Sequence, residues 1–201
     1  MSPAERLDVE RLRRALGGQR IGHRIEVLEE TTSTNDVVAE MASTSAEGLV
    51  VFAEQQTAGR GQYGRRWESA KGKGIWFSVL LRPEIAVAES SRITDFLARA
   101  VAVTIAAELQ LAPSIKPPND IYIEEKKVAG VLVEMRVEPT GGYCAVAGIG
   151  INANQQLADF PAELQTTATS LALAMGDDVD RTEFAIALLR EMETRYAADQ
   201  L

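Results

Sequence analysis

Two short apolar runs constrain the fold more than any other feature of this 201-residue chain. LVVFAE occupies residues 49–54, and GIWFSVLL occupies residues 74–81. Continuous apolar runs of this length, rich in valine, leucine and aromatic side chains, predict buried strands. The segment that joins them therefore has to run between two strands of the core.

This connecting segment is rich in glycine and arginine. EQQTAGRGQYGRRW, residues 54–67, contains three glycines and three arginines. Glycine lets backbone N–H groups approach an anion closely, and a guanidinium offers a planar fork to phosphate or carboxylate oxygens. We expect a loop that orders over a compact anion as a lid. The glycines are Gly59, Gly61 and Gly64, and the basic residues up to position 73 are Arg60, Arg65, Arg66, Lys71 and Lys73.

Composition excludes several classes of protein. Lysine and arginine total 21 against 29 acids, a net charge of -8, which disfavours binding to nucleic acid. No apolar run approaches the roughly 20 residues of a membrane span, and the start of the chain has no signal-peptide core. The single cysteine, Cys144, excludes an internal disulfide. We therefore expect a cytoplasmic protein that binds neither DNA nor membranes.

Periodicity predicts the remaining elements. The alternation of apolar and polar residues over 115–154 predicts an antiparallel meander with turns at EE and EPTGG. GIGIN at 148–152 is therefore not a dinucleotide-binding fingerprint, because that motif needs a following helix. Its glycines are expected to let a ligand lie against the strand. Lys127, taken alone, is interpreted as a solvated turn charge. We also predict helices over 4–17, after TTSTND (31–36), over 90–110 and from Asp180 onward, and a strand over 23–30.

Five motifs follow one another in order across residues 31–152. They are TTSTND, E-x-x-x-A-GRG-x-x-GR-x-W, K-x-PND, K-x-AG-x-L-x-E and G-x-G-x-N. Each motif is weak alone, but the ordered set between compatible strands is specific, and it resembles the catalytic domain of biotin protein ligase. The resemblance implies an α+β fold with a mixed, mainly antiparallel sheet flanked by helices. This fold is related to class II aminoacyl-tRNA synthetases and to the biotinyl and lipoyl protein ligases.

The resemblance also implies an activity and its partners. Such enzymes use ATP and Mg²⁺ to convert biotin to biotinyl-5'-AMP, then transfer biotin to a lysine of a biotin carboxyl carrier domain. A homodimer paired through sheet edges is a further expectation. Only about 20 residues precede the first predicted strand, too few for a winged-helix module. We expect one catalytic domain over residues 1–201, without a winged helix before it or a barrel-like domain after it.

Site residues follow from the motif positions. By the resemblance, the catalytic residues are Lys127, Arg60 and Asp120, and Asp120 is also the candidate metal ligand. The residues expected to bind biotin are Ser33, Thr34, Asn35, Gln56, Gly59, Arg60, Gly61, Lys127, Gly130, Leu132 and Gly148. The residues expected to bind the nucleotide are Arg60, Gln62, Arg65, Trp67, Asn119, Asp120 and Asn152.

Two positions depart from the family pattern. Gln62 stands where the loop usually has a second arginine, which removes a charge that would help to retain the adenylate. Pro117 stands where an aromatic residue is usual, and it stiffens the entry to the next strand. We expect the first change to speed release of the intermediate.

Two alternatives remain, one with the same fold and one from a different functional class. A lipoate or octanoate transferase shares the fold, and one branch uses a cysteine nucleophile. Cys144 lies in mid-strand outside the motif set, where a buried thiol is the commoner role. A noncatalytic biotin-binding or sensing module is the second alternative. Arg60, Asp120 and Lys127 weigh against it, because binding the neutral rings of biotin would not require all three.

Overall fold

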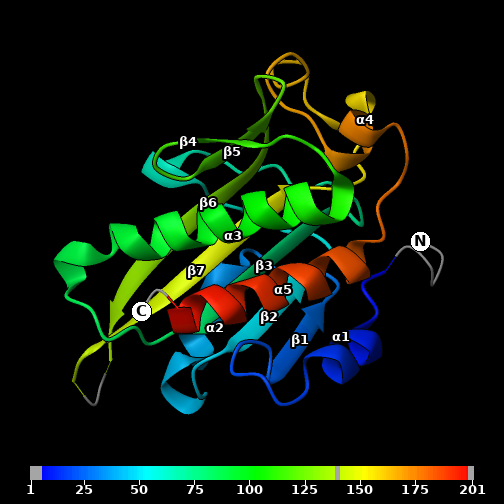
Figure 1. Ribbon diagram of the computed structural model, residues 1–201. Helices are drawn as coiled ribbons and strands as arrows, with labels where there is room; N and C mark the ends of the chain where they lie inside the picture. Colours follow the sequence, from blue (N-terminus) through cyan, green and yellow to red (C-terminus); the bar gives the residue numbers. More distant parts are fainter. Residues whose placement is uncertain (1–5, 139–140, 199–201) are drawn as a thin grey trace.

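The computed structural model describes residues 6–138 and 141–198. These residues form a mixed sheet with helices on both faces, and its strand order is β1-β2-β3-β7-β6-β5-β4 (Figure 1). Neighbouring strands pair antiparallel except β1 and β2, which run parallel in the described part of the chain. The predicted fold class is confirmed.

The parallel pairing of β1 with β2 arises from a βαβ unit. β1 (Arg24–Leu28) is followed by α2 (Thr34–Met41) and then by β2 (Leu49–Ala53). β3 (Gly74–Leu81) pairs antiparallel with β2 on one side and β7 on the other. Every residue of β2 and β3 is buried, as the two apolar runs predict.

The predicted meander is also present. β5 (Asp120–Ile123), β6 (Lys126–Val137) and β7 (Tyr143–Asn152) pair antiparallel in chain order. At the EE turn, Glu124 and Glu125 both have positive φ, 48° and 63°, as in the tight turns that suit hairpins. The EPTGG turn includes residues 139 and 140, which lie outside the described residues.

The two faces of the sheet are covered differently. α1 (Val9–Leu16), α3 (Ser91–Leu109) and α5 (Arg181–Ala198) cover one face, where they contribute to the main apolar core with side chains such as Phe77 and Val79 (Figure 1). Because strand side chains alternate, Leu80 points to the opposite face and packs with Val38 of α2. Below we call this opposite side of the sheet the α2 face. None of the helices in the described residues is both long and apolar enough to cross a bilayer.

Element boundaries differ from the sequence predictions at several places. The first helix begins at Val9 rather than residue 4, because the Asp8 side chain accepts a bond from Arg11 N and so caps the helix. Residues 4 and 5 lie outside the described residues. β4 (Ser114–Lys116) and α4 (Leu171–Met175) are not predicted, since three and five residues are too short to show a period. The last helix does begin after Asp180, whose carboxylate accepts from Glu183 N at 2.9 Å.

A buried ion pair joins distant parts of the chain. Arg181 Nη2 lies 2.9 Å from Glu54 Oε2, with side chains that are 5% and 1% exposed. Glu54 also accepts from Leu7 N at 2.7 Å, and Arg181 donates to the Gly74 carbonyl at 2.8 Å. The pair thus connects the segment before α1, the end of β2, the start of β3 and the start of α5.

We expect Arg181→Met to lower the free energy of unfolding by about 3–5 kcal/mol, because it leaves the Glu54 carboxylate buried without its partner. Urea denaturation followed by tryptophan fluorescence measures this change. The control is Asp95→Asn, which removes an exposed ion pair with Arg99 and should cost less than about 1 kcal/mol. Equal losses in the two variants would contradict a structural role for the buried pair.

Candidate active site

A pocket of about 440 Å³ opens on the α2 face of the sheet, within the size range of small-ligand sites. The loop between β2 and β3, the start of α2 and strands β5 to β7 enclose it. Gly59 is the one predicted site residue that does not line it. The predicted residues that line it are Ser33, Thr34, Asn35, Gln56, Arg60, Gly61, Gln62, Arg65, Trp67, Asn119, Asp120, Lys127, Gly130, Leu132, Gly148 and Asn152.

Three glycines on neighbouring strands form the floor of the pocket. Gly130 of β6 pairs with Gly150 of β7, and Gly148 lies two residues before Gly150 on the same face. A Cβ at Gly148 would stand 2.4 Å from Asn35 Oδ1, and one at Gly150 would stand 2.5 Å from the Trp67 ring. We expected a ligand to lie against these strands. The groups that occupy this space are the side chains of Asn35 and Trp67.

The glycine-arginine loop folds back on itself as a short hairpin. Trp67 N donates to the Gly59 carbonyl at 2.9 Å, and Gly61 N donates to the Arg65 carbonyl at 2.7 Å. At the tip, Tyr63 has φ 59° and is 91% exposed. This shape directs Arg60 and Trp67 into the pocket. Gly59 supports it indirectly, because a Cβ there would lie 2.8 Å from the Trp67 carbonyl.

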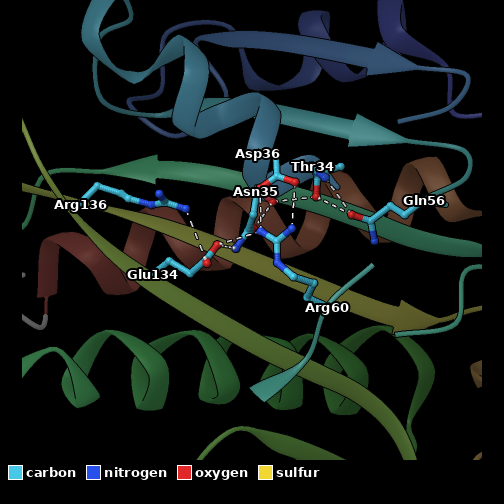
Figure 2. A network of polar contacts seen from close by, with 8 residues as sticks. Thr34, Asn35, Asp36, Gln56, Arg60, Glu134 and Arg136 are labelled. Carbon is cyan, nitrogen blue, oxygen red and sulfur yellow. Dashed lines mark hydrogen bonds and ion pairs between the residues drawn. The ribbon is translucent and has the colours of Figure 1, made fainter. Parts of the chain in front are cut away.

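Four side chains form what we call the polar wall: Thr34, Asn35 and Gln56, which line the pocket, and Ser78, which is fully buried in contact with Thr34 and Asn35. Gln56 Oε1 accepts from Thr34 N at 2.8 Å and from Thr34 Oγ1 at 3.1 Å (Figure 2). Ser78 Oγ lies 2.7 Å from Thr34 Oγ1 and 2.5 Å from Asn35 Oδ1. α2 begins at Thr34, inside the TTSTND motif rather than after it, and Ser33 occupies the cap position without a side-chain capping bond. Gln56 instead satisfies a backbone N–H group at the start of the helix.

Arg60 is held by two carboxylates. Its Nη1 and Nη2 donate to the two oxygens of Asp36 at 2.8 and 2.7 Å, and Nη2 lies 3.5 Å from Glu134 Oε2 (Figure 2). The hydrogen bonds to Arg60 lower the pKa of Asp36, and those to Asp36 raise the pKa of Arg60. Glu134 also lies 3.6 Å from an Nη2 atom of Arg136. Both terminal nitrogens of the Arg60 guanidinium are thus paired with carboxylate oxygens.

Three of these residues, Asp36, Glu134 and Ser78, are absent from the predicted site. Asp36 ends the TTSTND motif and Glu134 ends K-x-AG-x-L-x-E, so the motif positions could have indicated both. Ser78 gave no such signal, because it lies inside an apolar run.

Lys127 lies in the pocket, so its interpretation as a solvated turn charge is wrong. It is the second residue of β6, and its Nζ lies 2.6 Å from Asp120 Oδ1 on the neighbouring strand. The same Nζ stands 5.3 Å from the centre of the Trp67 ring, a distance typical of cation–π contacts. The side chain is 30% exposed, so its charge can reach a bound anion.

The described residues contain no cluster of three or more His, Cys, Asp or Glu side chains that could hold a metal. Asp120, the candidate metal ligand, is therefore not part of such a group.

Cys144 does not belong to the pocket. It is 1% exposed in the apolar cluster beneath α2, and burial raises the pKa of its thiol. A buried thiol of this kind is unreactive. The two departures from the family pattern, Gln62 and Pro117, both line the pocket.

Comparisons with known proteins agree with this geometry. The sequence pattern of the biotin/lipoate A/B protein ligase family matches residues 27–152. The chain is 40% identical over 192 residues to the bifunctional ligase/repressor BirA of Bacillus spizizenii, covering 95% of this chain but 59% of that protein. It is 35% identical to the biotin--[acetyl-CoA-carboxylase] ligase of Mycobacterium tuberculosis, covering 94% and 70%. The biotin protein ligase of Aquifex aeolicus, solved with biotin and ATP, superposes with a TM-score of 0.76 at 32% identity, over 88% of this chain and 72% of that one.

The ion pair between Arg60 and Asp36 generates a prediction for the pKa of the Asp36 carboxyl. In Arg60→Gln we expect the pKa of the Asp36 carboxyl to rise toward its ordinary value, because its main hydrogen-bond donor is lost. NMR of the side-chain carboxyl carbon across a pH series measures it. Since the folded pKa is lowered, the pairing stabilises the fold above the ordinary pKa of Asp and is lost as pH falls through the folded value. Identical titration in both proteins would contradict the pairing.

Proposed function

Because the chain belongs to the biotin/lipoate A/B protein ligase family, we propose that it activates biotin with ATP and transfers it to a lysine of a biotin carboxyl carrier domain. The observation that carries this proposal is the placement of Arg60 and Lys127, each held by a carboxylate, in one pocket with a polar wall. Such a pocket combines a binding surface for a neutral polar ring with positive charge for an anionic centre.

The chemistry of the first step explains why positive charge is needed. A carboxylate is a poor acyl donor, so the biotin carboxylate attacks the α-phosphorus of ATP, pyrophosphate leaves, and the mixed anhydride biotinyl-5'-AMP forms. Both reactants are anions. Catalysis then depends on holding them in line and on cations where negative charge collects. In our proposal Lys127 and Arg60 supply those cations, and no nucleophile on the protein is required.

The second step uses the carrier itself. The ε-amine of the carrier lysine attacks the anhydride carbonyl, AMP leaves, and an amide forms. Water would hydrolyse the same anhydride, so the pocket has to exclude it. We assign this task to the hairpin of residues 59–67, which forms one wall of the pocket.

We propose that the ligands divide the pocket between them. The biotin ring occupies the side with the polar wall and the floor, and the nucleotide occupies the side with the basic hairpin and the β4–β5 connection. Mg²⁺ would come with ATP, near Asp120, and would supply charge neutralisation at the phosphates. The proposed nucleotide contacts are Gln62, Arg65, Trp67, Asn119, Asp120 and Asn152, and the proposed biotin contacts are Ser33, Thr34, Asn35, Gln56, Gly61, Gly130, Leu132 and Gly148.

The setting of the enzyme is proposed on the same basis. The chain spans about 59% of the length of its Bacillus relative, so whole-protein properties of that relative are not carried over. We propose a single catalytic domain that works in the cytoplasm. Its net charge of -8 weighs against DNA as a partner. The homodimer stays a prediction.

We expect the protein to release pyrophosphate from ATP and Mg²⁺ only when biotin is present. Lys127→Ala should lower that rate by at least about 100-fold, because removal of one charge-stabilising donor typically costs that much. A coupled pyrophosphate assay measures the rate. Lys126→Ala is the matched control, because it removes the neighbouring, exposed lysine, and it should turn over like the wild type.

Other outcomes of this assay would separate the alternatives. Tight biotin binding without turnover would indicate a noncatalytic module, and activity with octanoate or lipoate in place of biotin would indicate the related transferases. Unchanged turnover in Lys127→Ala would remove Lys127 from the mechanism.

The position of Gln62 in the pocket generates a further prediction. Gln62→Arg adds a cation near the bound adenylate, so we expect biotinyl-5'-AMP to leave the enzyme about 3- to 10-fold more slowly in the absence of a carrier. Release of preformed adenylate, followed by filtration, measures this rate. Gln62→Met has a similar length without the charge and should not slow it. Equal rates in all three proteins would show that the residue at this position does not control retention.

A further inference from the structure

We propose that Glu134 is a positioning residue that fixes which hydrogen-bond donors and acceptors the polar wall presents to the ring of bound biotin. This inference rests on the proposed function, and it adds a residue on β6 to the recognition of the substrate. Glu134 reaches the wall through Asn35, while Arg60 and Arg136 lie on its other sides (Figure 2).

The closest polar contact of Glu134 is the one to Asn35. Asn35 Nδ2 donates to Glu134 Oε2 at 2.7 Å. A carboxamide can turn over and exchange its nitrogen and oxygen, whereas a carboxylate can only accept. If Asn35 turned over, its oxygen would face the carboxylate at hydrogen-bond distance, and the two would repel. Glu134 therefore keeps the Asn35 nitrogen on its own side and the Asn35 oxygen toward Ser78.

Packing restricts the Asn35 carboxamide to two orientations, which differ by exchange of its nitrogen and oxygen. The residue is 3% exposed, and its Oδ1 lies 2.4 Å from the position that a Cβ of Gly148 would occupy. The side chain is thus confined between the floor of the pocket and β6, so it cannot relieve a wrong contact by moving into solvent. The electrostatics at Glu134 decide its orientation.

The orientation of Asn35 then passes along the polar wall. Asn35 Oδ1 can only accept, so the Ser78 hydroxyl, 2.5 Å away and fully buried, directs its proton toward it. Because its one proton points to Asn35, Ser78 Oγ can only accept from Thr34 Oγ1, 2.7 Å away, and the single Thr34 hydroxyl proton is shared between Ser78 Oγ and Gln56 Oε1. At the far end, the backbone N–H of Thr34 can only donate, which fixes the oxygen of Gln56 toward the helix and its nitrogen away from it. Glu134, which can only accept, and the backbone N–H of Thr34, which can only donate, thus fix the orientations of the Asn35 and Gln56 amides at the two ends of the wall.

A wall of defined polarity suits the ring that we propose for this site. The ureido group of biotin has two N–H donors beside one carbonyl acceptor, so each wall group must present the correct atom. A mismatch would leave buried polar groups unpaired, which costs far more than a lost apolar contact. Glu134, which can only accept hydrogen bonds, fixes the orientation of the Asn35 amide and so avoids such a mismatch.

Neutralising Arg60 is the competing role for Glu134. The distances favour the contact with Asn35, because Glu134 Oε2 lies 2.7 Å from Asn35 but 3.5 Å from Arg60. Arg60 already has a bidentate partner in Asp36, whose side chain has no hydrogen bond to the Asn35 side chain among the described residues. Asp36 therefore provides a matched control, since it carries the same charge and contacts the same arginine.

The test separates binding from chemistry. We expect Glu134→Gln to weaken biotin binding by about 10- to 100-fold, the range for losing a hydrogen bond to a charged group, since the new amide can no longer fix Asn35. Isothermal titration calorimetry without nucleotide gives Kd. The rate of adenylate formation at saturating biotin should stay within about threefold of the wild type, because Asp36 still holds Arg60 through two hydrogen bonds.

A second substitution should restore the polarity. In Asn35→Asp/Glu134→Gln the new aspartate can only accept, so it takes the Ser78 proton with one oxygen and the new amide donor with the other. We expect this double variant to bind biotin at least about 5-fold more tightly than Glu134→Gln alone, a coupling typical of residues in direct contact. Asn35→Asp alone places two carboxylates together and should bind worse than the wild type. Asn35→Asp should give no such recovery in an Asp36→Asn background.

Each result is decisive for one of the two proposals. If the wild type neither binds biotin nor releases pyrophosphate with it, the proposed function is wrong, and this inference is wrong with it. If the wild type is active but Glu134→Gln keeps its Kd, loses rate rather than affinity, or is not rescued by Asn35→Asp, the positioning role of Glu134 is overturned. Failure of Glu134→Gln to fold would leave the double variant to decide, through its affinity relative to Asn35→Asp alone.

Discussion

The pocket depends on the missing side chains of three glycines. Gly130, Gly148 and Gly150 lie together on the α2 face of two paired strands, and a Cβ at any of them would press on Asn35, Trp67 or Lys127. The bare backbone lets Asn35 and Trp67 lie against the sheet, and Asn35 then reaches both Ser78 and Glu134. The concave shape and the polar contacts of the site thus share one cause.

Charge in the pocket is arranged as pairs. Arg60 with Asp36 and Lys127 with Asp120 each place a cation beside a carboxylate on a separate element of the fold. Two isolated cations this close to one cavity would repel each other and attract any anion. The carboxylates hold the cations in place, and an anionic ligand has to compete with them. Selectivity for a ligand that meets both cations together follows from this competition.

Much of this architecture could be predicted from the sequence, because the apolar runs and the alternation of the meander are strong local signals. All the site residues that the ordered motifs indicated line the pocket, except Gly59. Contacts between distant segments could not be predicted in the same way. Ser78 is hidden in an apolar strand, and Lys127 resembles a turn charge until the pairing of β5 with β6 places it beside Asp120. β4 and α4 are too short to produce a period.

The contacts of the polar wall join groups of the folded chain itself, whereas the hairpin of residues 59–67 meets solvent at its tip. Conformational freedom on the wall side is therefore lost once, when the chain folds, and not again at each encounter with a substrate. One side of the cavity acts as a rigid template, and any adjustment on ligand entry falls to the other. A change in the preferred acyl substrate would accordingly require substitutions in the polar wall. A change in the residence time of the product could arise from substitutions in the hairpin alone.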